Sequence, residues 1–213
     1  KKIIEERYER TGNLKYSLIY VPEGNKPDYF SDSDIFDKSE QVADDAVSDH
    51  LIDVYTEAVM KIDKYVTVRK FVSGQKDRDA ILADFAKGRL QVLTSMKCLD
   101  EGVDVPRAEI GIFTSSTGNP REFIQRRGRL LRNHEEKQYS YIYDTVVIPR
   151  TINRVDSYSA MESNLVKSEL KRVAYFATLA QNCYANNGAY EVLNDVANHF
   201  GITWSELIDN VEQ

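Results

Sequence analysis

Short β-forming segments alternate with helix-forming segments from Leu14 to Asp144, and this alternation constrains the fold more than any other feature. Consecutive strands separated by helices need crossover connections, which produce a mainly parallel sheet with helices on both faces. The chain is therefore predicted to form an α/β domain. The predicted strands are Leu14–Val21, Tyr65–Val72, Leu90–Thr94, Glu109–Thr114 and Tyr139–Asp144, and the predicted helices are Lys1–Arg10, Gln41–Lys61, Asp77–Lys87 and Pro120–Arg132.

The pattern changes after Pro149, where β-forming segments cease. Three helices are predicted there, at Ser157–Asn182, Ala189–Phe200 and Trp204–Val211. Thr203 and Glu206 have the spacing of a capping box at the start of the last helix. We therefore expect two domains, a sheet domain at residues 1–149 and a small all-α extension at residues 150–213 that packs on it.

The last two predicted helices also have the spacing of a helix-turn-helix, with Ala197, Gly201 and Leu207 at its small, turn and core positions. The segment Trp204–Glu212 would be the recognition helix, but it carries three acidic residues and no Lys or Arg. A helix that enters the major groove needs basic or amide donors. We therefore expect a helical cap rather than a DNA-reading module.

Composition narrows the class of protein further. The net charge of −6 argues against a free-standing nucleic-acid-binding module. No apolar run approaches the roughly 18–20 residues of a membrane span, and no signal peptide is visible. Cys98 and Cys183 suggest neither a disulfide framework nor a zinc site, which fits the reducing cytoplasm. The three histidines have no metal-ligand spacing, so no metal site is predicted within the chain. They are His50, His134 and His199.

Five of the arginines lie between Arg121 and Arg132, in a predicted helix. Helical geometry places Gln125, Arg129 and Arg132 within about 60° of one another. Ile124, Gly128 and Leu131 form the neighbouring stripe, which is suited to packing on a sheet. Gly128 costs on the order of 1 kcal/mol relative to Ala, so we expect another backbone to approach it closely. The arginine edge suits an anion and a bound water, although its spacing also fits a solvated basic face.

The segment Gln125–Arg132 resembles motif VI (Q-x-x-G-R-x-x-R) of superfamily 2 helicases. Upstream, Val92–Pro106 ends in Glu-Gly-Val-Asp-Val-Pro and resembles motif V, most closely in the restriction-enzyme and DNA-repair branch. Phe71–Gly74 is similar to the segment that precedes motif V, and Leu14–Val21 fits motif IV. The resemblance implies a RecA-like second motor domain.

The resemblance also implies roles for single residues. Arg132 would be the arginine finger, Arg129 would contact the γ-phosphate, and Gln125 would lie near phosphate or the attacking water. Gly102 and Asp104 would lie beside the nucleotide. Four residues would border the nucleic-acid backbone, namely Ser73, Gly74, Ser95 and Lys97. Met96 departs from the family, which often has a hydroxyl residue there, so phosphate contact is expected from Ser95 or Lys97 instead.

The sequence contains no G-x-x-x-x-G-K-[ST] loop. Because the chain begins at Lys1, we expect a fragment whose first RecA-like lobe lies upstream or on another chain. That lobe would bind most of the ATP phosphates and hold the Mg²⁺, so this chain alone is predicted to be inactive. The expected partner is nucleic acid, with DNA preferred over RNA. The alternative is a non-enzymatic α/β module that binds an anion or a protein partner through the arginine edge.

Overall fold

The structure is a computed structural model, and it describes residues 1–22, 50–96, 104–114, 120–149 and 160–209. The chain divides into two compact units, Lys1–Asp144 and Thr145–Gln213. The first unit contains a five-stranded, entirely parallel sheet with the strand order β2-β3-β1-β4-β5. The strands are β1 Ser17–Tyr20, β2 Val68–Phe71, β3 Val92–Ser95, β4 Ile110–Phe113 and β5 Tyr141–Asp144.

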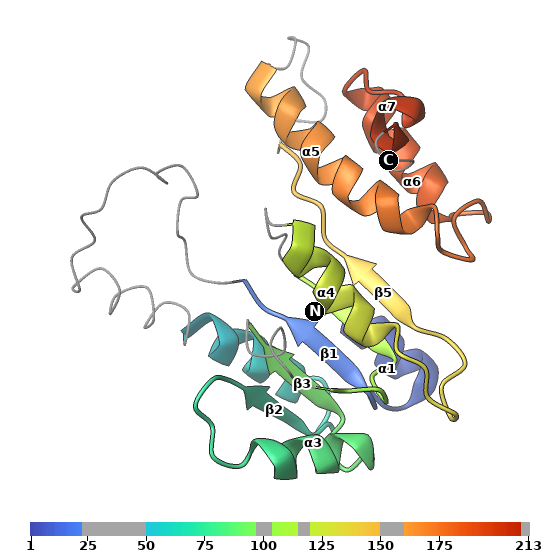
Figure 1. The fold of residues 1–213 in the computed structure, drawn as a ribbon. Helices are drawn as coiled ribbons and strands as arrows, with labels where there is room; N and C mark the ends of the chain where they lie inside the picture. The colour runs from blue at the N-terminus through green and yellow to red at the C-terminus, as the bar shows by residue number, and fades with distance from the viewer. Residues whose placement is uncertain (23–49, 97–103, 115–119, 150–159, 210–213) are drawn as a thin grey trace. The chain divides into compact units, whose positions relative to one another are not determined.

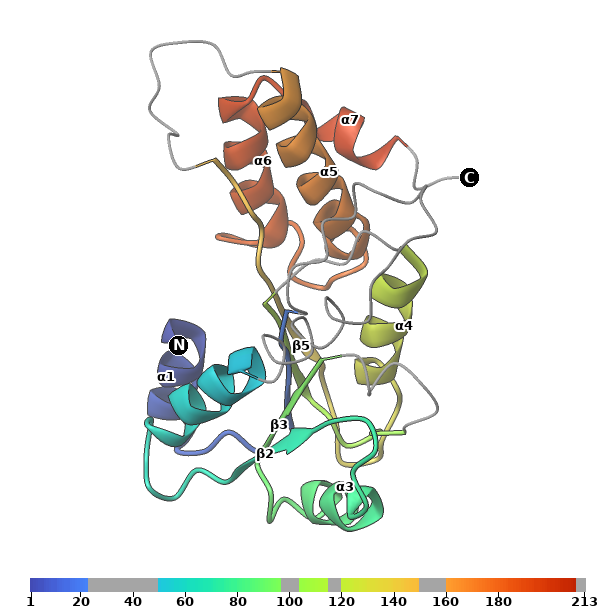
Figure 2. The same cartoon turned by 90° about the vertical axis from the view of Figure 1, so that its left-hand side faces the viewer.

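Helices cover both faces of this sheet (Figures 1 and 2). They are α1 Lys2–Thr11, the helical residues 50–60, α3 Arg78–Ala86 and α4 Pro120–Leu130. The predicted α/β class with a parallel sheet is therefore confirmed. Each observed strand lies within its predicted segment or ends one residue beyond it, but is shorter. The acidic segment 28–37 and the first nine residues of the predicted helix Gln41–Lys61 lie outside the described residues.

Alternation along β1 sends its side chains to opposite faces, because successive residues of a strand point in opposite directions. Leu18 and Tyr20 pack in the core that α3 and α4 cover, together with Phe85 and Leu130. Ile19 packs in the other core, which α1 and residues 50–60 cover. All four residues of β1 are buried, as expected for the central strand of a parallel sheet.

Tyrosines alternate along the fifth predicted strand, a pattern that predicts packing on the sheet rather than stacking on bases. Tyr143 packs against the core under α1, in agreement with that expectation. The Tyr141 ring lies 5.1 Å beneath the guanidinium of Arg7 in α1. Tyr139 precedes the observed strand and contacts Tyr141 edge to face, with ring centroids 6.5 Å apart.

The second unit has a hydrophobic core of its own, built from α5 Ala160–Ala177, α6 Ala189–His199 and α7 Trp204–Ile208. The predicted capping box at the start of α7 is present, since Thr203 and Glu206 exchange hydrogen bonds in both directions. Glu206 also accepts a 2.7 Å hydrogen bond from Lys167 of α5. These contacts lower the pKa of Glu206 to about 2, and the bond from Lys167 contributes most.

Candidate functional site

The carboxyl ends of all five strands lie at one edge of the sheet, because the strands are parallel. Ligands of open α/β sheets bind beyond this edge. The last residues of the strands are Tyr20, Phe71, Ser95, Phe113 and Asp144. Most of the residues singled out in the sequence follow these strand ends or lie on α4, which packs over them.

Two arginines attach α4 to the sheet. Arg127 is 1% exposed, its guanidinium lies 4.3 Å from the centre of the Phe113 ring, and it forms an ion pair with Asp144 at the end of β5. The guanidinium of Arg126 lies 5.6 Å from the Tyr20 ring, which itself stacks on Phe113. Stacking on aromatic faces lets guanidinium groups replace aliphatic side chains in this contact.

This packing corrects the predicted orientation of α4. Ile124 and Leu131 were expected to pack on the sheet, but they are 50% and 49% exposed. The buried face contains Arg126, Arg127 and Leu130 instead. The prediction was wrong because it assigned the buried face to aliphatic side chains, whereas aromatic residues of β1 and β4 here accept arginines.

The expected close approach to Gly128 is also absent from the described part of the chain. Gly128 is exposed, and a Cβ built on it would meet no described atom within 4 Å. Packing within this part of the protein therefore does not require a glycine at this position.

Gln125, Arg129 and Arg132 differ in their exposure to solvent. Gln125 is exposed, Arg129 is partly buried, and the Arg132 side chain is 46% exposed. Arg132 forms an ion pair through Nη1 with Oδ1 of Asp104, whose side chain is 59% exposed. The structure thus joins the expected arginine finger to the expected nucleotide residue of the motif V segment.

The predicted nucleic-acid residues differ in accessibility. Ser73 and Gly74 are exposed just beyond β2, and Gly74 has a φ of +75° that favours glycine. Ser95 is fully buried at the end of β3, which makes a direct contact through its side chain less favourable. Met96 is partly buried against the core on the α1 side of the sheet. Lys97 and Gly102 lie outside the described residues.

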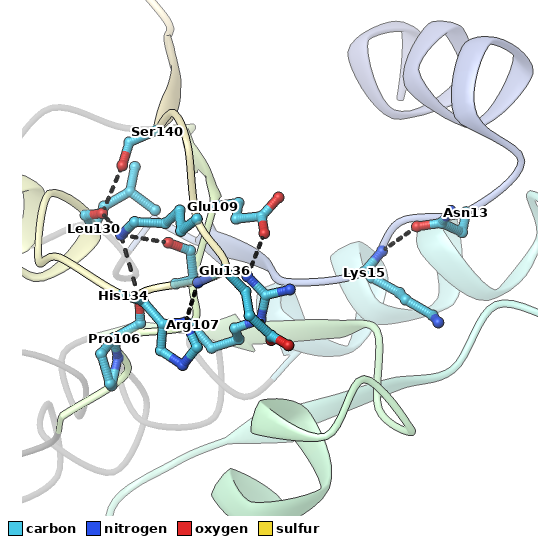
Figure 3. A network of polar contacts seen from close by, with 11 residues as sticks. Asn13, Lys15, Pro106, Arg107, Glu109, Leu130, His134, Glu136 and Ser140 are labelled. Atoms are coloured by element: carbon cyan, nitrogen blue, oxygen red, sulfur yellow. Dashed lines mark hydrogen bonds and ion pairs between the residues drawn. The ribbon is translucent and has the colours of Figure 1, made fainter.

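Lys137 is a residue that the sequence analysis missed. Its ammonium donates hydrogen bonds to the carbonyl oxygens of Pro106, Ala108 and Leu130, at 3.3, 3.1 and 2.8 Å. Ser140 donates a further 2.8 Å hydrogen bond to the Leu130 carbonyl (Figure 3). Because Leu130 ends α4, these donors satisfy a carbonyl that the helix leaves without an internal partner. A lone lysine that follows two glutamates gives no sequence signal for such a role.

Arg107 completes the surroundings of Lys137. Its guanidinium donates a 2.7 Å hydrogen bond to Glu109 and pairs with Glu136 at 3.3 Å (Figure 3). It also lies 4.0 Å from the centre of the Tyr16 ring. Burial lowers the pKa of Lys137, while the nearby Glu109 raises it by a smaller amount. The ammonium is therefore held by oriented carbonyl dipoles in a partly desolvated position.

Among the described residues, no helix has the length and hydropathy needed to cross a membrane. In the same part of the chain, no group of three or more His, Cys, Asp or Glu side chains could hold a metal ion.

Residues 46–134 match the family described as "Helicase conserved C-terminal domain". The DNA 3′-5′ translocase XPB2 of Sulfurisphaera tokodaii is 35% identical over 72 residues, which are 34% of this chain and 16% of that protein. Dicer-like protein 2 of Phaeosphaeria nodorum is 28% identical over 112 residues, 52% of this chain and 7% of that protein. The chain thus matches less than a fifth of the length of either relative.

Two solved structures are also similar. The Hef helicase domain of Pyrococcus furiosus has a TM-score of 0.43 and 22% identity, and the match covers 68% of this chain and 24% of that one. A fragment of a putative HsdR subunit of a type I restriction enzyme from Vibrio vulnificus has a TM-score of 0.42 and 21% identity, with coverage of 73% and 27%. The family match, which includes the motif V and motif VI segments, carries the assignment: residues 46–134 belong to the helicase conserved C-terminal domain family, which confirms over this span the resemblance to superfamily 2 helicases.

Proposed function

We propose that the sheet unit is the second motor lobe of an ATP-dependent helicase or translocase. The observation that carries this proposal is the ion pair between Arg132 and Asp104. It brings the helix resembling motif VI next to the segment resembling motif V. The ATP site would be shared with a first lobe that lies elsewhere in the full-length protein.

Two arginines of this site fit the phosphates of ATP in charge and in hydrogen-bonding capacity. Arg129 and Arg132 carry permanent charge and can each donate two hydrogen bonds to phosphate oxygens. The carboxylate of Asp104 occupies the kind of anionic position beside Arg132 that a phosphate would take. Exposed ion pairs contribute only about 0–1 kcal/mol, so exchanging this carboxylate for a phosphate would cost little.

In this proposal Arg132 stabilises the charge that develops on the transferred phosphoryl group, and Arg129 contacts the γ-phosphate. Gln125 orients phosphate or the attacking water. Asp104 and Gly102 would lie beside the nucleotide. Bound ATP would supply the phosphoanhydride whose hydrolysis drives motion, with Mg²⁺ held mainly by the first lobe. The chain by itself would be inactive, because these residues supply only one side of the site.

The moving partner would be a nucleic-acid strand that contacts the loop after β2. Ser73 and Gly74 are exposed there, and Lys97 would add a positive charge to the contact. DNA is favoured because one similar curated protein is a DNA 3′-5′ translocase. Closing and opening of the two lobes during each ATP cycle would move the protein along the strand.

The test replaces Arg132 by Ala in the full-length, two-lobe protein. Nucleic-acid-stimulated ATP turnover should fall by about 10³-fold or more, the usual contribution of an arginine finger, while the Kd for nucleotide stays within a few-fold. Arg89→Ala is a matched control, because Arg89 is also exposed and paired with a carboxylate, that of Asp84. Turnover that is unchanged by Arg132→Ala contradicts the proposal. Anion binding without any turnover would favour the non-enzymatic module.

A further inference from the structure

Among the described residues, two of the polar contacts connect the segment resembling motif V with the end of the helix resembling motif VI. One is the exposed Arg132–Asp104 ion pair. The other is Lys137, which hydrogen bonds at once to Pro106, the last residue of the motif V segment, and to Leu130 at the end of α4. The first contact can exchange with solvent or a ligand, whereas the second is partly buried and has three carbonyl partners.

The local structure directs Lys137 to this position. The backbone N–H of Lys137 donates a 2.9 Å hydrogen bond to the His134 carbonyl, which closes a turn directly after α4. The Glu136 N–H donates to Nδ1 of His134 at 3.2 Å within the same turn. These two hydrogen bonds hold the turn in place, so the side chain of Lys137 extends toward the two segments. The positive charge also suits the C-terminal end of α4, where the helix dipole is negative.

We propose that Lys137 is a positioning residue of the ATP site, which holds Asp104 and Arg132 at a fixed separation by tying Pro106 and Ala108 to the end of α4. This inference rests on the proposed function. Asp104 lies two residues before Pro106, and Arg132 lies two residues after Leu130, so the ammonium fixes the backbone close to both functional side chains. Lys137 itself does not touch the nucleotide.

Such a role has an energetic consequence for the reaction. When a phosphate replaces Asp104 as the partner of Arg132, the exposed ion pair no longer links the two segments. The Lys137 contacts then remain to keep the guanidinium in place for the transition state. Misplacement of a catalytic group by about 1 Å can cost on the order of 10²-fold in rate, so loss of these hydrogen bonds should weaken transition-state binding more than ground-state binding.

The experiment compares four substitutions with the wild type in the full-length protein. Lys137→Met keeps the stem length and removes the donors, and Lys137→Arg keeps the charge and part of the donor capacity. Val59→Ala is a stability control, because it opens a cavity on the other side of the sheet, where Val59 is fully buried. Arg132→Ala tests the arginine finger directly.

The deciding readout is the ratio of two affinities, for ADP with aluminium fluoride as a transition-state mimic and for ADP with beryllium fluoride as a ground-state mimic. A smaller folded fraction changes neither Kd in this ratio. Lys137→Met should lower the preference for the transition-state mimic by roughly 10-fold or more, Lys137→Arg should lower it less, and Val59→Ala should leave it unchanged.

Amide hydrogen exchange gives a second readout that needs no nucleotide. The amides of Ala108 and Leu131 bond to the Val105 and Arg127 carbonyls, at 2.9 and 3.0 Å. In Lys137→Met both should exchange faster, while the amides of β1 stay protected. If Arg132→Ala abolishes the preference and Lys137→Met leaves both readouts unchanged, the positioning role is wrong and the proposed function stands. If Arg132→Ala itself has no effect on turnover or preference, the proposed function fails.

Discussion

At the scale of single residues, the buried Arg127–Asp144 ion pair contributes differently to stability from the charges on the outer edge of α4. Arg127 has the largest volume among the fully buried side chains of the described residues, and the Asp144 side chain is only 8% exposed. Removing one partner of a buried pair leaves a charge with poor solvation, whereas replacing both by apolar groups can be nearly neutral. The exposed Arg132–Asp104 pair carries no such penalty.

Arg127→Met should therefore lower the free energy of unfolding of the sheet unit by about 3–5 kcal/mol. The double variant Arg127→Met/Asp144→Leu should recover most of this loss. Urea denaturation followed by far-UV circular dichroism measures both. Arg132→Ala is the surface control and should change stability by less than about 1 kcal/mol. Equal losses in the single and double variants would show that the pair does not explain the burial of Arg127.

At the scale of elements, α4 combines a buried face made of arginine stems with an exposed face that contains a glycine. Gly128 is a helix residue with open space around its Cα in the described part of the chain. Gly in a helix interior costs about 0.5–1 kcal/mol relative to Ala. Packing among the described residues does not require a glycine at this position. We infer that another part of the full-length protein approaches Gly128 closely, and in the proposed motor that part would be the first lobe.

Gly128→Ala should accordingly stabilise the chain by about 0.5–1 kcal/mol in urea denaturation while lowering ATP turnover of the full-length protein. The added methyl group would lie between Gln125 and Arg132 on the exposed side of the helix. Higher stability with unchanged turnover would mean that the first lobe leaves room at this position. Lower stability would instead contradict the open space around Gly128.

The elements themselves were largely predictable from sequence, because periodicity and turn chemistry are local. The order of strands and helices, the parallel sheet and the Thr203–Glu206 capping box were all confirmed. The rotation of α4 was not predictable, because it depends on aromatic rings from β1 and β4 that meet only in the folded sheet. The contacts of Lys137 were missed for the same reason, since two of its three acceptor carbonyls are about 30 residues away in the chain.

At the scale of the whole molecule, the chain contains two units with separate hydrophobic cores. The core of the helical unit is formed by residues from α5 to α7 and includes Leu170, which is fully buried. Trp204 is the single tryptophan of the chain and packs edge to face on Tyr190 in the same unit, at 4.9 Å. Its fluorescence therefore reports on the helical unit alone.

We expect the two units to unfold in separate transitions. Leu170→Ala should lower the stability of the helical unit by about 2–5 kcal/mol, because it leaves a cavity in that core, and should shift the Trp204 fluorescence transition to lower urea. Phe85→Ala, in the core under α3, should instead shift the part of the far-UV signal that arises from the sheet unit and leave the Trp204 transition in place. If each variant shifts both the Trp204 fluorescence transition and the far-UV transition, the two units unfold as one cooperative unit. A loss of stability in one core can shift the unfolding of the other only in that case.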